Sequence, residues 1–221
     1  MFAFPPQTAF GKTVPKSRIY SHALPTRRVR ELFVSQLSEI IWTHKLSPET
    51  LRIPGTPAVP EIQVFDLILK GESLDEDVIH AIDRAIPFPI FHRLRSETGD
   101  AWSAAYKRPS EADGSQWVVG SRFTSSSLLH NSSFILPPLP AALDLGRLYA
   151  ALFAPLLPLP PRAGEDLPRH IERCEAYNRL RRQVDQLTTR LHRERHFNRK
   201  VERNRELKPL LAELAVLKHD S

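Results

Sequence analysis

Apolar residues recur at helical spacing soon after the proline-marked start of the chain. Between residues 26 and 46 they lie mostly three or four positions apart, at Val29, Leu32, Phe33, Leu37, Ile40 and Ile41. This spacing places them on one face of a helix. Thr26 can cap the first turn, and Ser47-Pro48 can end the last one. The pattern therefore predicts a helix over residues 26–46.

A second pattern begins after a proline-rich loop. Residues 61–70 are apolar at nearly every position, which is typical of a strand buried in the centre of a sheet. Residues 73–86 then return to helical spacing. Ser73 is the predicted N-cap, the acidic run 75–77 suits the positive end of the helix dipole, and Pro87 ends the helix.

Three more strands are predicted at residues 89–95, 101–107 and 116–124, with turns between them that contain Gly99 and Gly114. The order is then helix, strand, helix and three strands. This order predicts an α+β fold with a mixed four-stranded sheet and helices mainly on one face. A C-terminal helical arm or hairpin, similar to a coiled coil, is expected to follow it.

The chain divides into three predicted parts. Residues 1–135 form the α+β core domain, and residues 168–221 form a basic helical arm. Residues 136–167 are a proline-rich connector with a short helix, predicted at 141–156. The serine-rich and then proline-rich residues 125–139 are predicted to be a loop.

The arm carries an apolar seam at spacings of three and four residues. We define the partner-helix seam as the residues Tyr177, Leu180, Val184, Leu187 and Leu191. Glu194 and Asn198 interrupt this pattern. Pro209 is predicted to open a last helix, and the arm is expected to fold back near residues 204–209.

Charge is distributed unevenly along the chain. The 221 residues carry a net charge of +6, but residues 1–30 hold six Lys/Arg and no acid, and residues 31–168 are acidic overall. Residues 169–208 hold 13 Lys/Arg against six Asp/Glu. The single cysteine excludes an intramolecular disulfide, and no apolar run is long enough to cross a membrane. We therefore expect a cytoplasmic protein.

The basic part of the arm is the candidate nucleic-acid contact. Arginine-rich helices attract phosphate backbones, and the planar guanidinium group makes bidentate contacts with phosphate. Two other interpretations remain open, a solvated coiled-coil face paired with its own acids and a surface that docks onto an acidic protein. The candidate nucleic-acid-binding residues are Arg190, Arg193, Arg195, Arg199, Lys200 and Arg203.

Enzyme chemistry has little support in the sequence. A metal-dependent nuclease of the restriction type would draw on Glu61, Asp66, Asp83 and Lys107, but the usual acid-x-lysine spacing is missing. No glycine-rich phosphate loop or His-Glu-x-x-His pair occurs. We therefore assign no catalytic residue, no metal ligand and no cofactor.

Four segments carry a family resemblance, at residues 60–66, 82–91, 105–109 and 197–202. Together they resemble the bacterial domain-of-unknown-function 4391 family, over nearly the whole chain. The family's genes are often found beside DNA methyltransferases and helicases in restriction or phage-defence islands. The resemblance implies an accessory protein and supplies no catalytic residues.

The combined hypothesis is a non-catalytic accessory subunit of a DNA-targeting restriction or antiviral defence system. Its expected partner is a larger helicase or methyltransferase, with double-stranded DNA as a candidate ligand of the arm and no membrane association. The first alternative is a structural coiled-coil adaptor that dimerises or grips its partner through the seam. The second alternative is the metal-dependent nuclease.

Overall fold

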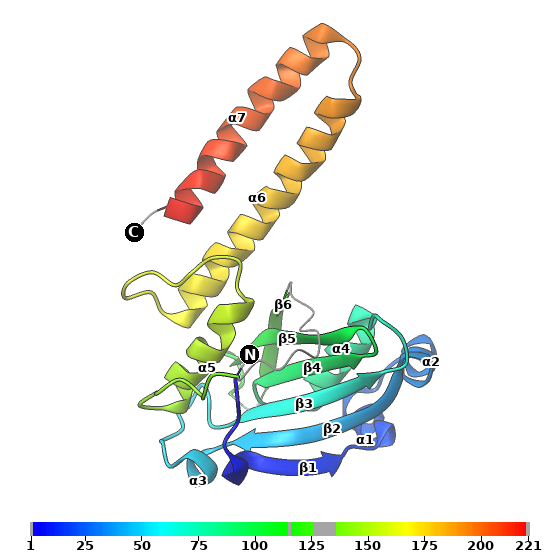
Figure 1. Cartoon of the computed structure of the whole chain (residues 1–221), viewed down its shortest axis with the longest axis vertical. Coiled ribbons are helices and arrows are strands. Elements are labelled where there is room, and N and C mark those ends of the chain that lie inside the picture. Colours follow the sequence, from blue (N-terminus) through cyan, green and yellow to red (C-terminus); the bar gives the residue numbers. More distant parts are fainter. Residues whose placement is uncertain (1, 115, 126–135, 220–221) are drawn as a thin grey trace. The chain divides into compact units, whose positions relative to one another are not determined.

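The computed structural model describes residues 2–114, 116–125 and 136–219. The chain divides into two compact units, Met1–Leu156 and Leu157–Ser221. The first unit is an α+β domain built on one mixed sheet. The second contains two long helices that run side by side (Figure 1).

The sheet has six strands in the order β1-β2-β3-β4-β5-β6. All neighbouring strands are antiparallel except β3 and β4, which are parallel and are joined by the crossover helix α4. A parallel pair requires such a crossover. The elements of the unit are β1 (Ala9–Thr13), α1 (Lys16–Ala23), α2 (Arg27–Gln36), β2 (Leu37–Leu46), α3 (Pro48–Leu51), β3 (Ile62–Leu69), α4 (Glu76–Ala85), β4 (Ile90–Ser96), β5 (Gly99–Pro109), β6 (Trp117–Thr124) and α5 (Leu145–Phe153), with 3-10 turns at Pro6–Thr8 and Ala154–Leu156.

The α+β class is confirmed, but the predicted four-stranded sheet is wrong because β1 and β2 were missed. The Thr26 side chain accepts a hydrogen bond from the Val29 N–H, as an N-cap should. The helix nevertheless ends at Gln36, and residues 37–46 form β2. Ile40 and Ile41 fit either a helical face or a strand, and pairing of β2 with both β1 and β3 selects the strand.

The other predicted strands agree with the structure to within two residues. Helix α4 differs in its cap, since Asp75 rather than Ser73 accepts a hydrogen bond from the Asp77 N–H. The connector helix is shorter than predicted, because Asp144 caps α5 directly before Leu145. Most of the loop predicted at 125–139 lies outside the described residues.

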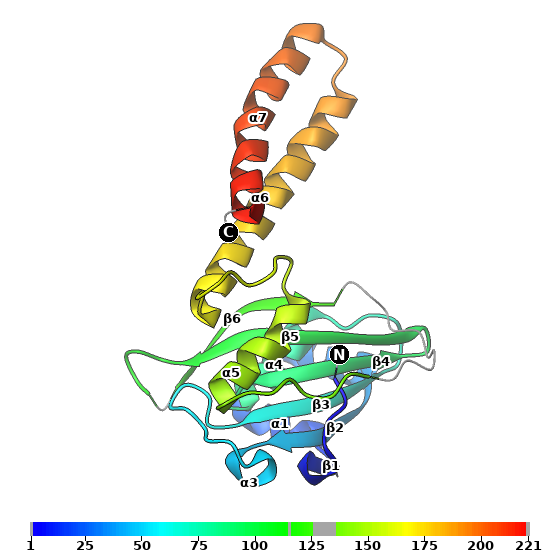
Figure 2. The same ribbon diagram turned by 60° about the vertical axis from the view of Figure 1, so that its left-hand side comes forward.

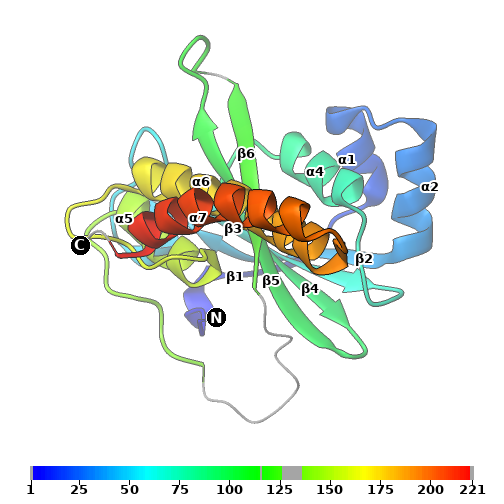
Figure 3. The same cartoon turned by 90° about the horizontal axis from the view of Figure 1, so that it is seen from above.

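Helices α1, α2 and α4 are grouped on one side of the sheet (Figure 3). Buried apolar side chains from all three helices and from strands β2, β3 and β4 form one core on this face. Its members include Ile19, Phe33, Phe65, Leu67 and Ile82, each at most 2% exposed. Burial of such side chains drives the packing of the helices onto the sheet.

Helix α5 covers the opposite face of the sheet (Figure 2). Its Tyr149 and Phe153 are buried and make edge-to-face contacts with Phe91. Phe153 also contacts Tyr106 and Phe123 in the same geometry. These aromatic contacts fix α5 against β4, β5 and β6.

The second unit is a helical hairpin of α6 (Leu167–Arg193) and α7 (Phe197–His219). The chain folds back at residues 194–196, about ten residues earlier than predicted. Pro209 lies inside α7 and does not open a new helix. In the described part of the chain, no helix is both long enough and apolar enough to span a membrane.

Arg173 ties the two ends of the hairpin unit together. Its guanidinium group forms a two-pronged ion pair with Glu165, at 2.7 Å for each contact, and donates to the Leu217 carbonyl at 3.3 Å. Lys218 lies over the ring of Tyr177. These contacts place the end of α7 beside the first half of α6, so the two helices are antiparallel.

Candidate functional site

The tip of the hairpin, which we define as residues 190–203, is organised by Glu194. Its Oε1 accepts hydrogen bonds from the N–H groups of Arg195 and His196, at 3.0 and 3.1 Å, and its Oε2 pairs with Arg203 at 3.0 Å. The hydrogen bond from the His196 backbone lowers the pKa of Glu194. The hydrogen bond from the Arg195 backbone and the charges of the nearby arginines lower it further. The charged carboxylate therefore satisfies two backbone donors of the turn that directly precedes α7.

Arg203 is part of this turn. It donates to the Arg190 carbonyl at 2.5 Å and is paired with Glu194. The carbonyl belongs to the last turn of α6, where basic side chains stabilise open acceptors. Arg203 therefore joins the two helices, a role that the charge pattern alone did not distinguish from ligand binding.

The other five candidate residues face solvent at the tip. Among the described residues of the hairpin, no carboxylate lies within ion-pair distance of their side chains, so their charge is available to a ligand. The interpretation of this surface as a helix face paired with its own acids thus has no support at these positions, which are Arg190, Arg193, Arg195, Arg199 and Lys200.

Phe197 is an unexpected member of this surface. It is the first residue of α7, and it is 77% exposed. An exposed aromatic ring among cations is the combination that single-stranded nucleic-acid sites use to stack bases and hold phosphates. The sequence analysis did not include Phe197 among the candidate binding residues. The sequence feature that could have indicated it is the Phe-Asn-Arg-Lys run directly after the break in the apolar seam.

The partner-helix seam lies along α6 in the same unit. Tyr177, Leu180 and Val184 are buried, whereas Leu187 and Leu191 are half-buried. Leu214 of the neighbouring helix α7 is buried as well. The α7 helix of the same chain therefore supplies apolar side chains for this seam.

A separate polar cluster lies between α4 and the sheet. Asp83 of α4 accepts from His92 Nε2 at 3.0 Å and forms an ion pair with Arg122 of β6. Lys107 of β5 donates to the carbonyls of Asp83 and Ile86, at 2.7 and 2.5 Å. All of the donors in this cluster converge on α4, so its charges hold the helix on the sheet.

Burial and the surrounding charges set the protonation of this cluster. Burial alone would raise the pKa of Asp83, but His92, Arg122 and Lys107 lower it to about 2. Burial, with Arg122 and Lys107, lowers the pKa of His92. In the neutral ring that donates through Nε2, the Nδ1 atom carries no proton. The buried Nδ1, which has no hydrogen-bond partner, therefore does not leave an N–H group without an acceptor.

The residues considered for a nuclease do not meet at one place. Asp66 lies on the α5 face of β3 and pairs with Arg93 and Arg95, while Asp83 lies on the opposite face. Glu61 pairs with Lys45 at 2.6 Å. Within residues 2–114, 116–125 and 136–219, no three His, Cys, Asp or Glu side chains are placed to hold a metal ion.

Fold and site together define an α+β domain protein with a basic helical hairpin. Residues 2–214 match the model of the family described as Domain of unknown function (DUF4391), and the chain belongs to this family. The expected family membership is thereby confirmed. Searches of curated proteins and of solved structures found no match.

Proposed function

We propose that the protein is a non-catalytic accessory subunit of a DNA-targeting restriction or phage-defence system, and that the hairpin tip binds nucleic acid. The α+β domain serves as the body that docks a larger helicase or methyltransferase. The gene neighbourhood that the family resemblance implies supports the defence context.

The observation that carries this proposal is the chemistry of the tip. Five exposed cations without a carboxylate partner in the hairpin belong to the same short tip as the exposed ring of Phe197. Cations bind the phosphates and release counterions, while the ring stacks on a base. An ordinary solvated helix needs neither the excess of positive charge nor an exposed phenylalanine.

The adaptor alternative rests on apolar surface that a second chain would cover. Val201, Leu211 and Val216 of α7 are exposed. They are spread over an arc of about 140° on the helix surface. The exposed Asn204, Arg205 and Lys208 lie on the same arc, so the apolar residues do not form a continuous face. The exposed apolar side chains of α7 therefore give the adaptor alternative weaker support than the chemistry of the tip gives to nucleic-acid binding.

The nucleic-acid half of the proposal is tested by fluorescence anisotropy with labelled single-stranded and duplex DNA over a salt series. We expect affinity to fall steeply with salt. In the triple variant Arg193→Ala, Arg195→Ala, Arg199→Ala, the slope of log K against log salt should be shallower by about 2–3, since each lost phosphate contact removes roughly 0.7–0.9. Phe197→Ala should weaken single-strand binding by about 1–3 kcal/mol.

The matched control removes three exposed arginines from the first unit, through Arg27→Ala, Arg52→Ala and Arg84→Ala. It changes the net charge equally and should leave the salt slope as in the wild type. Absence of wild-type binding at low salt, or equal losses in both triple variants, would contradict the proposal.

Light scattering separates the adaptor from the proposed function. Under our proposal Leu187→Asp leaves the molar mass unchanged, because Leu187 is half-buried in a hairpin whose two helices pack against each other within one chain. An oligomer that the substitution dissociates would support the adaptor instead.

A further inference from the structure

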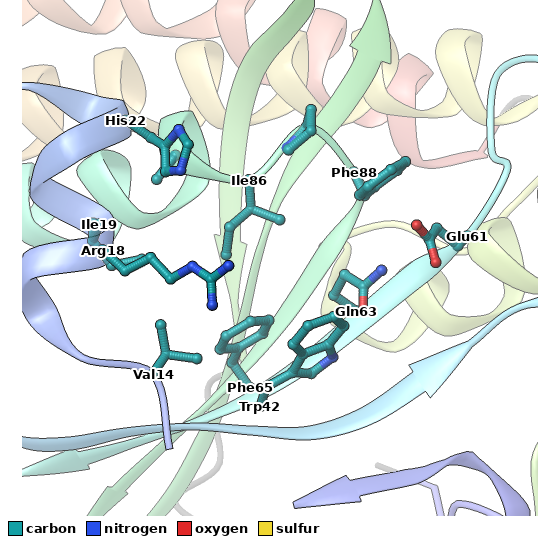
Figure 4. Close-up of a pocket in the computed structure, with 12 residues that line it drawn as sticks. Val14, Arg18, Ile19, His22, Trp42, Glu61, Gln63, Phe65, Ile86 and Phe88 are labelled. Atoms are coloured by element: carbon teal, nitrogen blue, oxygen red, sulfur yellow. The ribbon is translucent and has the colours of Figure 1, made fainter. Parts of the chain in front are cut away.

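A pocket of about 230 Å³ opens on the helix side of the sheet, within the first unit. Helix α1, strands β2 and β3 and the chain after α4 supply its walls (Figure 4). The charged side chains of the polar cluster under α4 do not line it, and of that cluster only Ile86, whose carbonyl accepts from Lys107, belongs to the pocket wall. Its volume lies just below the roughly 300–1,000 Å³ of pockets for drug-sized ligands, so it can enclose one ring system while the rest of a ligand extends through its open mouth.

Gln63 is the first sign that the pocket is built for a ligand. The residue lies near the start of β3 and is 1% exposed, yet its buried Oε1 has no hydrogen-bond partner. A buried acceptor without a partner is costly and needs an explanation. Because Gln63 lines the pocket, a ligand N–H group there would supply the missing donor.

Aromatic side chains form the apolar walls beside Gln63. The rings of Trp42 and Phe65 are stacked at 5.8 Å with an interplanar angle of 9°, and Phe88 lines the pocket as well. Figure 4 shows Trp42 next to the amide of Gln63. Flat apolar walls beside one amide group suit a planar ring with polar atoms on its edge.

The mouth of the pocket is positively charged. Arg18 and His22 of α1 line it and are exposed, and the guanidinium group of Arg18 points toward the middle of the pocket (Figure 4). Among the described residues, no carboxylate lies within ion-pair distance of Arg18. The acid of the pocket, Glu61, is neutralised by Lys45. An anionic group on the ligand would therefore be drawn to Arg18.

We propose that this pocket binds a nucleoside monophosphate. The base packs on Trp42 and donates an edge N–H to the Oε1 of Gln63, while the phosphate pairs with Arg18. The site is independent of the hairpin tip, so it adds a small-molecule ligand to the proposed accessory role. A fatty acid would fit the charge but would leave Gln63 without a donor.

Isothermal titration calorimetry with AMP, GMP, CMP and UMP tests this site on the full chain. We expect at least one of the four to bind. Gln63→Leu should lower its affinity at least tenfold while the thermal midpoint of the free protein stays level or rises, because the substitution removes the acceptor that has no partner. Arg18→Ala should weaken binding of the nucleotide at least tenfold and bring it close to that of the matching nucleoside.

Two controls keep the outcome specific. Arg27→Ala removes an exposed arginine outside the pocket and should bind as the wild type does. The triple variant of the hairpin tip should also retain binding, which separates this site from the proposed nucleic-acid contact. The inference is overturned if no monophosphate binds, if Gln63→Leu binds normally, or if the tip variant loses the nucleotide.

Discussion

At the scale of single residues, Lys107 shows how a buried charge serves the fold. Its side chain is 1% exposed and donates to two carbonyls at the C-terminal end of α4. Pro87 follows that end and has no N–H group, so the chain itself cannot continue the helical bonds. Lys107 of β5 thus caps the C-terminal end of α4, although it does not belong to that helix.

The protonation of Lys107 leads to a prediction about alkaline stability. Burial, and to a lesser degree Arg122, lowers the pKa of Lys107 to about 8. In the unfolded chain a lysine has a pKa of about 10.4. Between these two values the unfolded state binds more protons, so this group makes the free energy of unfolding rise with pH.

Lys107→Met removes this contribution. Urea unfolding of both proteins from pH 7.5 to 10.5 should show the wild type gaining on the variant by on the order of 1–3 kcal/mol across the window. Other titrating groups are common to the two proteins and cancel in the difference. A difference that stays constant with pH would show that Lys107 keeps an ordinary pKa in the folded protein.

At the scale of elements, the hairpin depends on a turn of three residues. Glu194 interrupts the apolar seam of α6, and its carboxylate accepts hydrogen bonds from the two N–H groups directly before α7. Ion pairing with Arg203 holds the returning helix at the end of α6.

Glu194→Ala should loosen the start of α7. We expect lower hydrogen-exchange protection at residues 195–200 and unchanged protection in the sheet, because two backbone donors lose their acceptor. Since the pKa of Glu194 is lowered in the folded state, its stabilisation is complete above the unfolded value of about 4.3 and is lost as pH falls through the folded value.

The pH dependence gives this prediction a second readout. Acidification through the lowered folded pKa of Glu194, below the unfolded value of about 4.3, should bring wild-type protection at the tip down to the level of the variant. Glu202→Ala is the matched control, since Glu202 is exposed and forms no ion pair among the described residues. Equal protection in Glu194→Ala and in the wild type would show that the turn forms without the carboxylate.

At the scale of the whole molecule, structure and charge divide at the same place. The first unit holds 16 Lys/Arg and 15 Asp/Glu, whereas the second holds 15 and 10. The first unit contains the sheet and the helices on both of its faces. Nearly all of the excess positive charge therefore belongs to the hairpin.

This division predicts that residues 1–156 fold without the hairpin. Thermal unfolding followed by circular dichroism should show one cooperative transition, while binding to DNA is lost. A chain that ends at residue 144 is the control, because it lacks Tyr149 and Phe153 and exposes the aromatic face of the sheet. Loss of each buried aromatic side chain costs about 3–5 kcal/mol, so this shorter chain should be unfolded or strongly destabilised. A non-cooperative transition for residues 1–156 would contradict the prediction.

Local signals in the sequence were sufficient for much of the fold. The Thr26 cap, the apolar run of β3 and the spacing of the strands after α4 were all read correctly, because each depends on residues that are neighbours in the chain. The concentration of arginines at the hairpin tip was likewise visible. Whether they bind nucleic acid remains a prediction.

Tertiary structure decided the rest, because pairing and burial outweigh local preference. Residues 37–46 have apolar spacing that suits a helix, yet the hydrogen bonds that β1 and β3 offer make them a strand. The ion pair of Glu194 with Arg203 joins the turn to the returning helix, and the sequence alone does not show this contact. Arg18, Trp42 and Gln63 are far apart in the sequence, so only packing of α1 against the sheet brings them to one pocket.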